Sequence, residues 1–487
     1  MKRDVSDNLT LHTDDYELNM MATYFEKGMQ QRRAVFEVYF RKLPFQNGYA
    51  VFAGLQHVIE YLEQLHFSAA DIEYLAANQD YSAAFLDYLS QFEFHGNIRS
   101  VKEGDLVFNN EPILQVEGTI AECQLIETAL LNIVNYQTLV ATKAARIRSV
   151  AGNDPLLEFG SRRAQEVAAA VWGTRAAYIG GFDATSNVLA GKKFGIPISG
   201  THAHSLVEAF GNDYDAFKAY AETHYECVFL VDTFDTLKSG VPTAIRVAQE
   251  MGNRINFKGV RIDSGDMAYL SKRVREMLDR AGFPAAKIYA SNDLDENTIS
   301  SLKMQGAKID TWGVGTKLIT AFDQPALGAV YKLVSVENDR GQMIDTIKLS
   351  NNAEKVSTPG KKQVWRITEK QDGKSEGDYV ALATEHPQDA DHLYMFHPQY
   401  TYINKTIHDF NAEPLLKDIF IDGKLVYQQP TLLEIKKHAQ RVQEQLWPEY
   451  KRMLNPQEYP VDFSKKLWDH KMNLITEIHN GQEHKLQ

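Results

Sequence analysis

Two histidines, His202 and His204, are the residues of this chain best suited to chemistry at a binding site. They lie in residues 200–205 (GTHAHS), directly after the apolar run 195–199 (GIPIS), which predicts a short buried strand. In α/β folds, ligands bind at the carboxyl ends of the strands, where these polar, titratable side chains would lie. The alternative is an ordinary loop in which both histidines touch only solvent.

Polar side chains also follow the other predicted strands in the middle of the chain, and this recurrence favours a binding site. The six sets are Glu158 and Arg162, Thr201 and His204, Asp232 and Thr233, Arg261 and Asp263, Ser291 to Asp293, and Gly313 to Thr316. Because the carboxyl ends of parallel strands lie at one edge of a sheet, these sets predict a single mouth lined with anion-binding groups and carboxylates.

Two of the loops have the composition of a phosphate site. Residues 291–293 (SND) and 313–316 (GVGT) precede predicted helices, and small residues there expose backbone N–H groups at a helix N-terminus. In barrel enzymes the phosphate site typically follows the last strands. Both loops fall late in the repeated region, so we predict that they bind phosphate.

The segment 263–266 (DSGD) adds carboxylates to the predicted mouth, with Arg261 two residues before it. Side chains alternate along a strand, so Arg261 and Asp263 point to the same side. A guanidinium binds a planar carboxylate or a phosphate through two parallel hydrogen bonds. Asp266 starts the following helix, where capping alone would explain its presence.

The elements that position these residues are repeated strand–helix units, which begin at about Pro155. The predicted strands are 156–160, 194–201, 227–234, 257–266, 287–293 and 308–316. Nearly continuous apolar strands between helices predict a parallel sheet that is covered on both faces. Six units fall short of the eight in a closed barrel, so an irregular barrel and a doubly wound open sheet both remain open.

The regions before and after these units have a different pattern. Before them we predict helices over 12–31, 50–65 and 122–150, a strand over 34–44 and short antiparallel strands over 97–118, the first helix opening with a capping box of Asp14 and Glu17. After Ala329 the pattern predicts antiparallel strands, and amphipathic helices follow between residues 430 and 480.

The composition indicates a globular protein of the cytoplasm. Of the 487 residues, 44% are hydrophobic, far more than in a disordered chain. The net charge of −12 disfavours nonspecific binding to nucleic acid. Cys123 and Cys227 lie in apolar runs and are predicted to be buried thiols of a reducing compartment. We find no zinc-site spacing, signal sequence or membrane span.

Together, these segments resemble the nicotinate phosphoribosyltransferase family, whose members act in NAD salvage. The matching stretches are 13–21 (TDDYELNMM), 40–55 (FRKLPFQNGYAVFAGL), 158–165 (EFGSRRAQ), 180–187 (GGFDATSN), 200–205, 231–236 (VDTFDT), 259–266 (GVRIDSGD), 289–296 (YASNDLDE) and 313–334 (GVGTKLITAFDQPALGAVYKLV). The resemblance implies an α/β protein of three parts: an N-terminal α+β domain (1–150), an irregular TIM-like phosphoribosyltransferase barrel (151–340), and a smaller C-terminal domain of strands and then helices (341–487).

The resemblance also implies the reaction. Nicotinate and 5-phosphoribosyl 1-pyrophosphate would give nicotinate mononucleotide and pyrophosphate, coupled to the hydrolysis of ATP. The nicotinate ring nitrogen is a neutral nucleophile and needs no general base, so the site must align it and stabilise a cationic ribosyl transition state. Asp263 suits that cation and the ribose hydroxyls, and Mg²⁺ would neutralise the pyrophosphate. No nucleic acid or membrane partner is expected.

Individual residues carry over from the family by position. His204 matches the histidine that ATP phosphorylates, with His202 at a variable position beside it. Tyr16, Thr201 and Arg261 match the nicotinate site, and Phe159 matches an aromatic residue that stacks on the pyridine ring opposite Tyr16 of a second subunit, which implies a homodimer with shared sites. The remaining matches are Arg162 and Thr316 at phosphate positions, and Ser186 where the nicotinamide-using relative carries an aspartate that would repel a carboxylate.

Four other functions remain open at this stage. Nicotinamide phosphoribosyltransferase is the nearest alternative, and Ser186 argues against it. Quinolinate phosphoribosyltransferase would require an additional cluster of Lys and Arg at the rim. A non-catalytic metabolite-binding homologue, or a phosphate-binding barrel such as an isomerase, would not require His204, Arg261 and Asp263 together.

Overall fold

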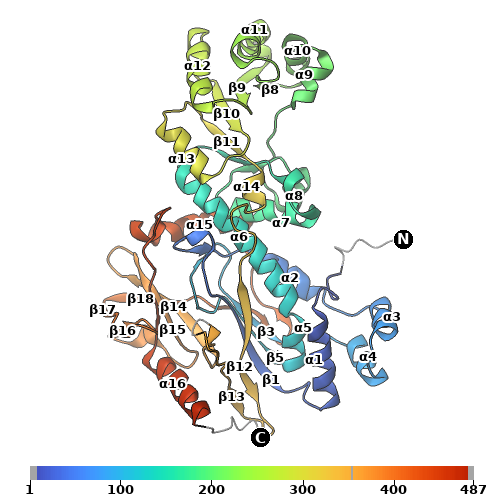
Figure 1. The fold of residues 1–487 in the computed structure, drawn as a ribbon, viewed down its shortest axis with the longest axis vertical. Coiled ribbons are helices and arrows are strands. Elements are labelled where there is room, and N and C mark those ends of the chain that lie inside the picture. Colours follow the sequence, from blue (N-terminus) through green and yellow to red (C-terminus); the bar gives the residue numbers. More distant parts are fainter. Residues whose placement is uncertain (1–7, 353–354, 481–487) are drawn as a thin grey trace. The chain divides into compact units, whose positions relative to one another are not determined.

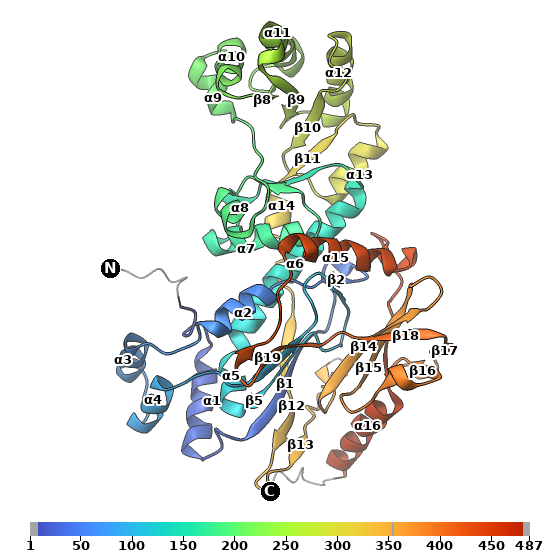
Figure 2. The same cartoon turned by 180° about the vertical axis from the view of Figure 1, so that it is seen from behind.

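The computed structural model describes residues 8–352 and 355–480. Within it the chain forms two compact units: one runs to Leu139 and resumes at Ala326, and the other is Val140–Pro325. Figures 1 and 2 show their elements from opposite sides. The first unit contains the expected N-terminal and C-terminal domains, and the second contains the strand–helix units. The boundaries 1–150, 151–340 and 341–487 stay a prediction.

The second unit is built on a parallel six-stranded sheet with the order β7-β6-β11-β10-β9-β8. The strands are β6 (Leu156–Glu158), β7 (Ala184–Thr185), β8 (Glu226–Leu230), β9 (Asn256–Ile262), β10 (Lys287–Ser291) and β11 (Thr311–Val314). Read as a circle, this order is the order of the strands along the chain, as in a barrel. The sheet is therefore a curled, irregular barrel, which confirms the barrel alternative over the doubly wound sheet.

The barrel is interrupted between β7 and β8. The predicted strand over 194–201 is wrong in extent, because residues there form only an isolated parallel bridge from Ile198 to Thr185. Thr185 N–H donates to Pro197 O at 3.0 Å and Ser199 N–H to Thr185 O at 2.9 Å. Since the N–H and C=O of one residue point to the same side of a strand, and Pro197 has no N–H, the donor that would extend this ladder along β7 is missing. β7 itself, Ala184–Thr185, was not among the predicted strands.

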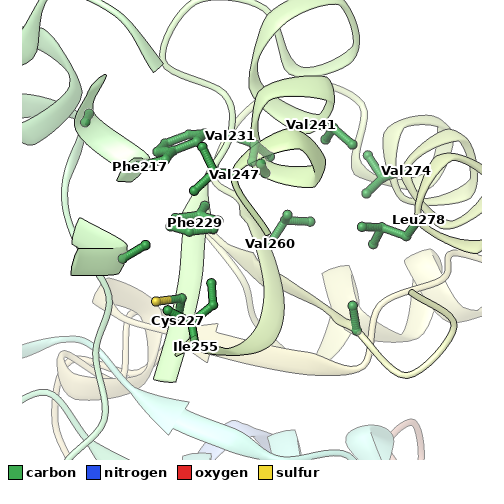
Figure 3. Close-up of a cluster of buried hydrophobic side chains, with 14 of the residues drawn as sticks. Phe217, Cys227, Phe229, Val231, Val241, Val247, Ile255, Val260, Val274 and Leu278 are labelled. Carbon is green, nitrogen blue, oxygen red and sulfur yellow. The ribbon is translucent and has the colours of Figure 1, made fainter. Parts of the chain in front are cut away.

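A hydrophobic core fixes which face of the sheet each side chain takes. Phe229 and Val231 of the β8 region and Val260 of β9 pack with Val247 and Val274 in one buried cluster (Figure 3). This cluster joins the sheet to helices α10 (Asp213–Thr223), α11 (Val241–Met251) and α12 (Met267–Arg280). Since side chains alternate along a strand, the opposite face of β9 carries Arg261.

The remaining elements of the second unit are short helices between the strands. They are η2 (Ser161–Arg163), α7 (Glu166–Ile179), α8 (Val188–Phe194), α9 (His204–Phe210), the π-helical turn η3 (Thr236–Gly240), η4 (Gly252–Arg254), α13 (Glu296–Met304) and α14 (Thr316–Ile319). Asn187, Asp266 and Asp295 cap α8, α12 and α13 through side-chain oxygens. These caps fix where the loops at the strand ends stop.

Within the described residues, the first unit contains three sheets. The antiparallel sheet β13-β12-β1-β5-β3-β19-β20 is formed by β1 (Arg33–Phe40), β3 (Asn97–Ser100), β5 (Leu114–Thr119), β12 (Ala329–Glu337), β13 (Met343–Asp345), β19 (Lys417–Ile421) and β20 (Lys424–Leu425). A mixed sheet, β17-β16-β21-β15-β14-β18, contains β14 (Lys362–Glu369), β15 (Ser375–Leu382), β16 (His392–Phe396), β17 (Asn404–His408), β18 (Phe410–Pro414) and β21 (Val461–Phe463). The third pairs β2 (Ala50–Val51) with β4 (Leu106–Val107).

The helices of the first unit include α1 (Asp15–Glu26), α2 (Leu55–Glu63), α3 (Ala69–Asn78), α4 (Ala83–Ser90), α5 (Ile120–Leu125), α15 (Leu432–Gln445) and α16 (Lys465–His479). The helix predicted over 122–150 is two helices, α5 and α6 (Glu127–Ala151). The capping box of Asp14 and Glu17 is wrong: Asp14 makes no side-chain cap bond to α1 and accepts instead from Thr128 Oγ1 at 2.9 Å. None of the described helices has the length and apolar character required to cross a lipid bilayer.

Candidate functional site

The carboxyl ends of β8 and β9 bring one histidine and two aspartates together. His204 Nε2 lies 3.9 Å from Asp232 Oδ1 and 3.9 Å from Asp263 Oδ2. On the other side of the ring, His204 Nδ1 and Thr233 Oγ1 are 3.0 Å apart. The His204 side chain is 38% exposed, so it is accessible to a ligand while both its nitrogens face polar groups.

Asp232 holds the turn after β9 in place. Its Oδ2 accepts from Asp263 N–H at 3.0 Å and from Ser264 Oγ at 2.6 Å. The side chain is only 2% exposed, and within the described residues its Oδ1 is a buried oxygen with no hydrogen-bond partner. A buried carboxylate oxygen without a donor is costly, and this one is directed to the side where His204 lies.

Asp263 is fixed from the neighbouring strand. Ser291 Oγ, at the end of β10, donates to Asp263 Oδ1, and Asp263 is one-third exposed. The two carboxylates therefore place concentrated negative charge at the mouth of the barrel. Asp266 caps α12, since its Oδ1 accepts from Tyr269 N–H at 2.9 Å.

Arg261 lies on the barrel-side face of β9 and lines a small cavity of ≈ 110 Å³. Its Nη2 donates to His202 O at 3.2 Å, whereas its buried Nε has no partner within the part of the chain that the structure describes. Burial lowers the pKa of Arg261, and the nearby Asp263 and Asp232 oppose that shift. The guanidinium thus remains a cation with an unused donor.

The cavity contains aromatic and apolar surface beside this cation. Its lining comprises Leu157, Phe159, Ser199, Gly200, Thr201, Tyr220, Glu226, Val228, Lys258, Arg261, Tyr289, Ala290 and Gly313. A Cβ at Gly313 would lie 2.6 Å from the Phe159 ring, so a glycine is required there for the ring to take this position. Drug-sized ligands occupy roughly 300–1,000 Å³, and the smaller space here suits a single ring.

The loop after β6 is anchored by Glu158. This carboxylate is buried and accepts from Gly160 N–H, from Thr174 Oγ1 at 2.9 Å and from Thr185 Oγ1 at 2.6 Å. Burial raises its pKa, and these hydrogen bonds oppose the shift. Glu158 is therefore directed away from the mouth, although the sequence predicted that Glu158 and Arg162 both line it. Its role is to support the loop that carries Phe159 and the exposed Arg162.

The other predicted site residues are not all brought together. Thr201 lines the cavity, and Thr316 begins α14 after the last strand. Ser186 is exposed after β7, where its N–H donates to Glu158 O at 2.9 Å, and it is not part of the cavity lining. Tyr16 belongs to the other unit, on α1, and is 48% exposed. Burial and neighbouring carboxylates raise the pKa of Tyr16 to about 12.

Among the cavity residues that sequence reasoning missed are two tyrosines. Tyr289 belongs to β10 and Tyr220 to α10, and both line the cavity beside Arg261. Alternation from Ser291 could have assigned Tyr289 to that face. No sequence signal indicates Tyr220, because its place depends on how α10 packs beside the interruption in the barrel.

Comparisons with known proteins cover nearly the whole chain. The chain matches the nicotinate phosphoribosyltransferase (NAPRTase) family over residues 155–369, the N-terminal domain of that enzyme over 11–135 and its C-terminal domain over 361–471. It is 59% identical over 481 residues to nicotinate phosphoribosyltransferase of Bacillus subtilis, covering 99% of this chain and 98% of the relative. The corresponding protein of Caenorhabditis elegans is 37% identical, with 94% of this chain and 92% of that relative covered.

A solved structure shows the same architecture. Human nicotinic acid phosphoribosyltransferase superposes with a TM-score of 0.83 at 29% identity, covering 95% of this chain and 99% of the human one. The similarity thus extends over both compact units as well as over the sequence. The chain belongs to the nicotinate phosphoribosyltransferase family of enzymes.

Proposed function

We propose that this protein forms nicotinate mononucleotide and pyrophosphate from nicotinate and 5-phosphoribosyl 1-pyrophosphate in NAD salvage, with ATP hydrolysed through a phosphohistidine. The observation that carries the proposal is the half-buried Arg261, whose buried Nε lacks a partner within the described residues, in a cavity that fits one ring. The same barrel mouth holds His204 and two carboxylates.

The nicotinate carboxylate would pair with Arg261. A carboxylate can accept from two guanidinium nitrogens at once, and the unpartnered Nε supplies one of them. Phe159 and the apolar lining would hold the pyridine ring. This orientation leaves the ring nitrogen directed away from Arg261, toward the ribosyl carbon.

The ribosyl group would lie beside Asp263 and Asp232. As the bond to pyrophosphate breaks, positive charge develops on the ribose, and fixed carboxylates stabilise that charge. The pyridine nitrogen lone pair forms the new bond to the anomeric carbon and pyrophosphate leaves with the old bonding pair. Arg162, exposed beside the mouth, and Thr316 at the start of α14 would bind phosphate groups.

Mg²⁺ is the cation expected with pyrophosphate. The described residues contain no group of three or more His, Cys, Asp or Glu side chains arranged for a metal ion. Protein-bound Mg²⁺ commonly uses one or two carboxylates together with substrate phosphates. Asp263 and the unpartnered Oδ1 of Asp232 fit that requirement, and Mg²⁺ held there would neutralise charge on the departing pyrophosphate.

ATP would act as a second substrate at His204. When Thr233 Oγ1 accepts from Nδ1–H, the Nε2 lone pair is available to attack the γ-phosphorus. An N–P bond then forms while the bond to ADP breaks. Hydrolysis of this phosphoramidate would complete the coupled reaction.

Two further features belong to this proposal. Ser186 does not line the cavity, but it leaves its surroundings without the negative charge with which an aspartate there would repel an approaching carboxylate, which favours the acid as substrate. Tyr16, which is half exposed on α1, would contribute to the site of a second copy in a homodimer with shared sites.

Product analysis tests the proposed function. Purified protein is incubated with nicotinate, 5-phosphoribosyl 1-pyrophosphate and Mg²⁺, with and without ATP. We expect nicotinate mononucleotide and pyrophosphate in equal amounts, with ATP increasing the yield and giving ADP. No mononucleotide under any of these conditions would refute the proposal.

A further inference from the structure

His202 differs from its neighbour His204 in its exposure and in the hydrogen bonds of its ring. Its side chain is buried, with 8% exposure, and its Nε2 accepts a hydrogen bond from Leu230 N–H at 3.1 Å. The lone pair that a phosphate carrier would use is therefore occupied. Its ring must have another role.

The partner of His202 is a backbone donor at the interruption in the barrel. β8 is the last strand of the sheet, so one of its edges has no neighbouring strand. Val231 N–H donates to Arg261 O of β9 at 3.1 Å. Because successive N–H groups point to opposite sides of a strand, Leu230 N–H points to the open edge, where the His202 ring takes the place of a strand carbonyl.

The hydrogen bond determines the tautomer of the ring. An Nε2 that accepts must be unprotonated, so the proton lies on Nδ1, which is 3.4 Å from Ala203 O. Burial lowers the pKa of His202 to about 4, consistent with a neutral ring. Phe217 and Tyr220 of α10 pack against it with ring centroids 5.7 and 5.1 Å away.

The backbone of His202 contacts Arg261, the residue proposed to bind the substrate carboxylate. His202 O accepts from Arg261 Nη2 at 3.2 Å, and the buried Nε of the same guanidinium has no partner within the described residues. Two residues later the chain starts α9 with His204. A ring anchored to β8 thus fixes the carbonyl that orients Arg261.

We propose that His202 is a positioning residue: its neutral Nδ1–H imidazole anchors the 199–204 loop to the open edge of β8 and thereby sets the Arg261 guanidinium for the substrate carboxylate. This inference rests on the proposed function for the identity of that carboxylate. The anchoring itself does not depend on it.

Two substitutions separate positioning from general stability. His202→Phe keeps an aromatic ring but removes the acceptor, and His202→Gln keeps an acceptor oxygen within reach of Leu230 N–H. For His202→Phe we expect KM for nicotinate to rise about tenfold or more, with kcat at saturating nicotinate reduced much less. His202→Gln should recover KM to within about threefold of the wild type. An unchanged KM in folded His202→Phe, or no recovery in His202→Gln, would overturn the proposal.

A spectroscopic measurement on the wild type depends neither on the kinetics of the variants nor on the proposed function. In protein labelled with ¹⁵N-histidine, the ring nitrogens of His202, assigned by their loss in His202→Gln, should show a protonated Nδ1 and an unprotonated Nε2 at pH 7. An Nε2–H tautomer or a doubly protonated ring would contradict the proposal. If the wild type makes no nicotinate mononucleotide, the proposed function fails, and this spectrum still decides whether His202 anchors the loop.

Discussion

At the residue scale, the proposed chemistry depends on one cation and one histidine at the same mouth. Arg261 has a buried, unpartnered Nε among the described residues, and His204 lies 3.9 Å from two carboxylates. Each group is suited to a different substrate. Substitutions at the two positions should therefore impair different steps.

Arg261→Gln should weaken nicotinate binding. The substitution removes the positive charge and the two N–H donors that would bind the carboxylate. The loss of a charge-assisted hydrogen-bonded pair costs on the order of 2–3 kcal/mol. We expect KM for nicotinate to rise about 30-fold to 150-fold. Steady-state kinetics would check this, with Lys287→Gln, an exposed cation on β10, as the matched control. A normal KM in Arg261→Gln would remove Arg261 from the site.

His204→Ala should separate ATP hydrolysis from ribosyl transfer. Without the imidazole no phosphohistidine can form, so ATP hydrolysis and its stimulation of the reaction should both be lost. Some transfer should survive at saturating 5-phosphoribosyl 1-pyrophosphate, since Arg261 and Asp263 remain. Labelling with γ-³²P ATP measures the first effect, with Glu208→Gln on the exposed side of α9 as the control. Complete loss of both activities in a folded protein would contradict a purely energetic role.

At the element scale, the packing of α1 depends on a buried acid. Glu17 accepts from Thr13 Oγ1 and from Thr128 Oγ1 at 2.9 Å, the latter on α6. Burial raises its pKa from 4.5 to about 7, opposed by these hydrogen bonds. The folded protein then binds more protons than the unfolded chain between these pH values, so stability is lost as the pH rises through about 7.

Glu17→Gln should remove this pH dependence. The amide keeps an acceptor oxygen and cannot ionise, so the variant should gain on the order of 1–2 kcal/mol relative to the wild type between pH 5 and pH 8. Chemical denaturation at the two pH values measures the change, with the exposed Glu63→Gln of α2 as the control. A difference between variant and wild type that is the same at both pH values would refute the assignment.

The elements also show what the sequence could predict. Apolar runs identified β8, β9, β10 and β11, because a buried strand has a clear pattern. The run 195–199 has the same pattern, but Pro197 and the interruption in the barrel leave it only one isolated bridge. β7 contains two residues, too few for any periodicity. The position of His202 could not be predicted because it depends on the open edge of β8.

At the scale of the whole molecule, the fold was predictable because the resemblance extends through the chain. The barrel and the flanking domains are confirmed by the structure and by the human enzyme. The site itself was predictable where strand alternation applies, as for Arg261. It was not predictable for Glu158, whose polar character indicated the mouth but whose three donors hold it in the interior.

A shared site predicts that two defective variants can complement each other. If Tyr16 completes the site of a second copy, Tyr16→Ala and Arg261→Gln should each be poorly active, and mixed subunits should recover activity. Random pairing gives half heterodimers with one intact site in two, so about a quarter of wild-type activity is expected. The activity is measured after the variants are unfolded and refolded together, with each variant refolded alone as the control. No recovery despite proven heterodimers would refute shared sites.

Competition between nicotinate and its amide tests directly whether Arg261 binds a substrate carboxylate. Wild-type protein is given equimolar nicotinate and nicotinamide with 5-phosphoribosyl 1-pyrophosphate, Mg²⁺ and ATP, and the two mononucleotides are counted by mass spectrometry. A mouth in which Arg261 binds a carboxylate predicts that nicotinate mononucleotide exceeds the amide product at least 100-fold. Equal amounts, or an excess of the amide product, would contradict the account.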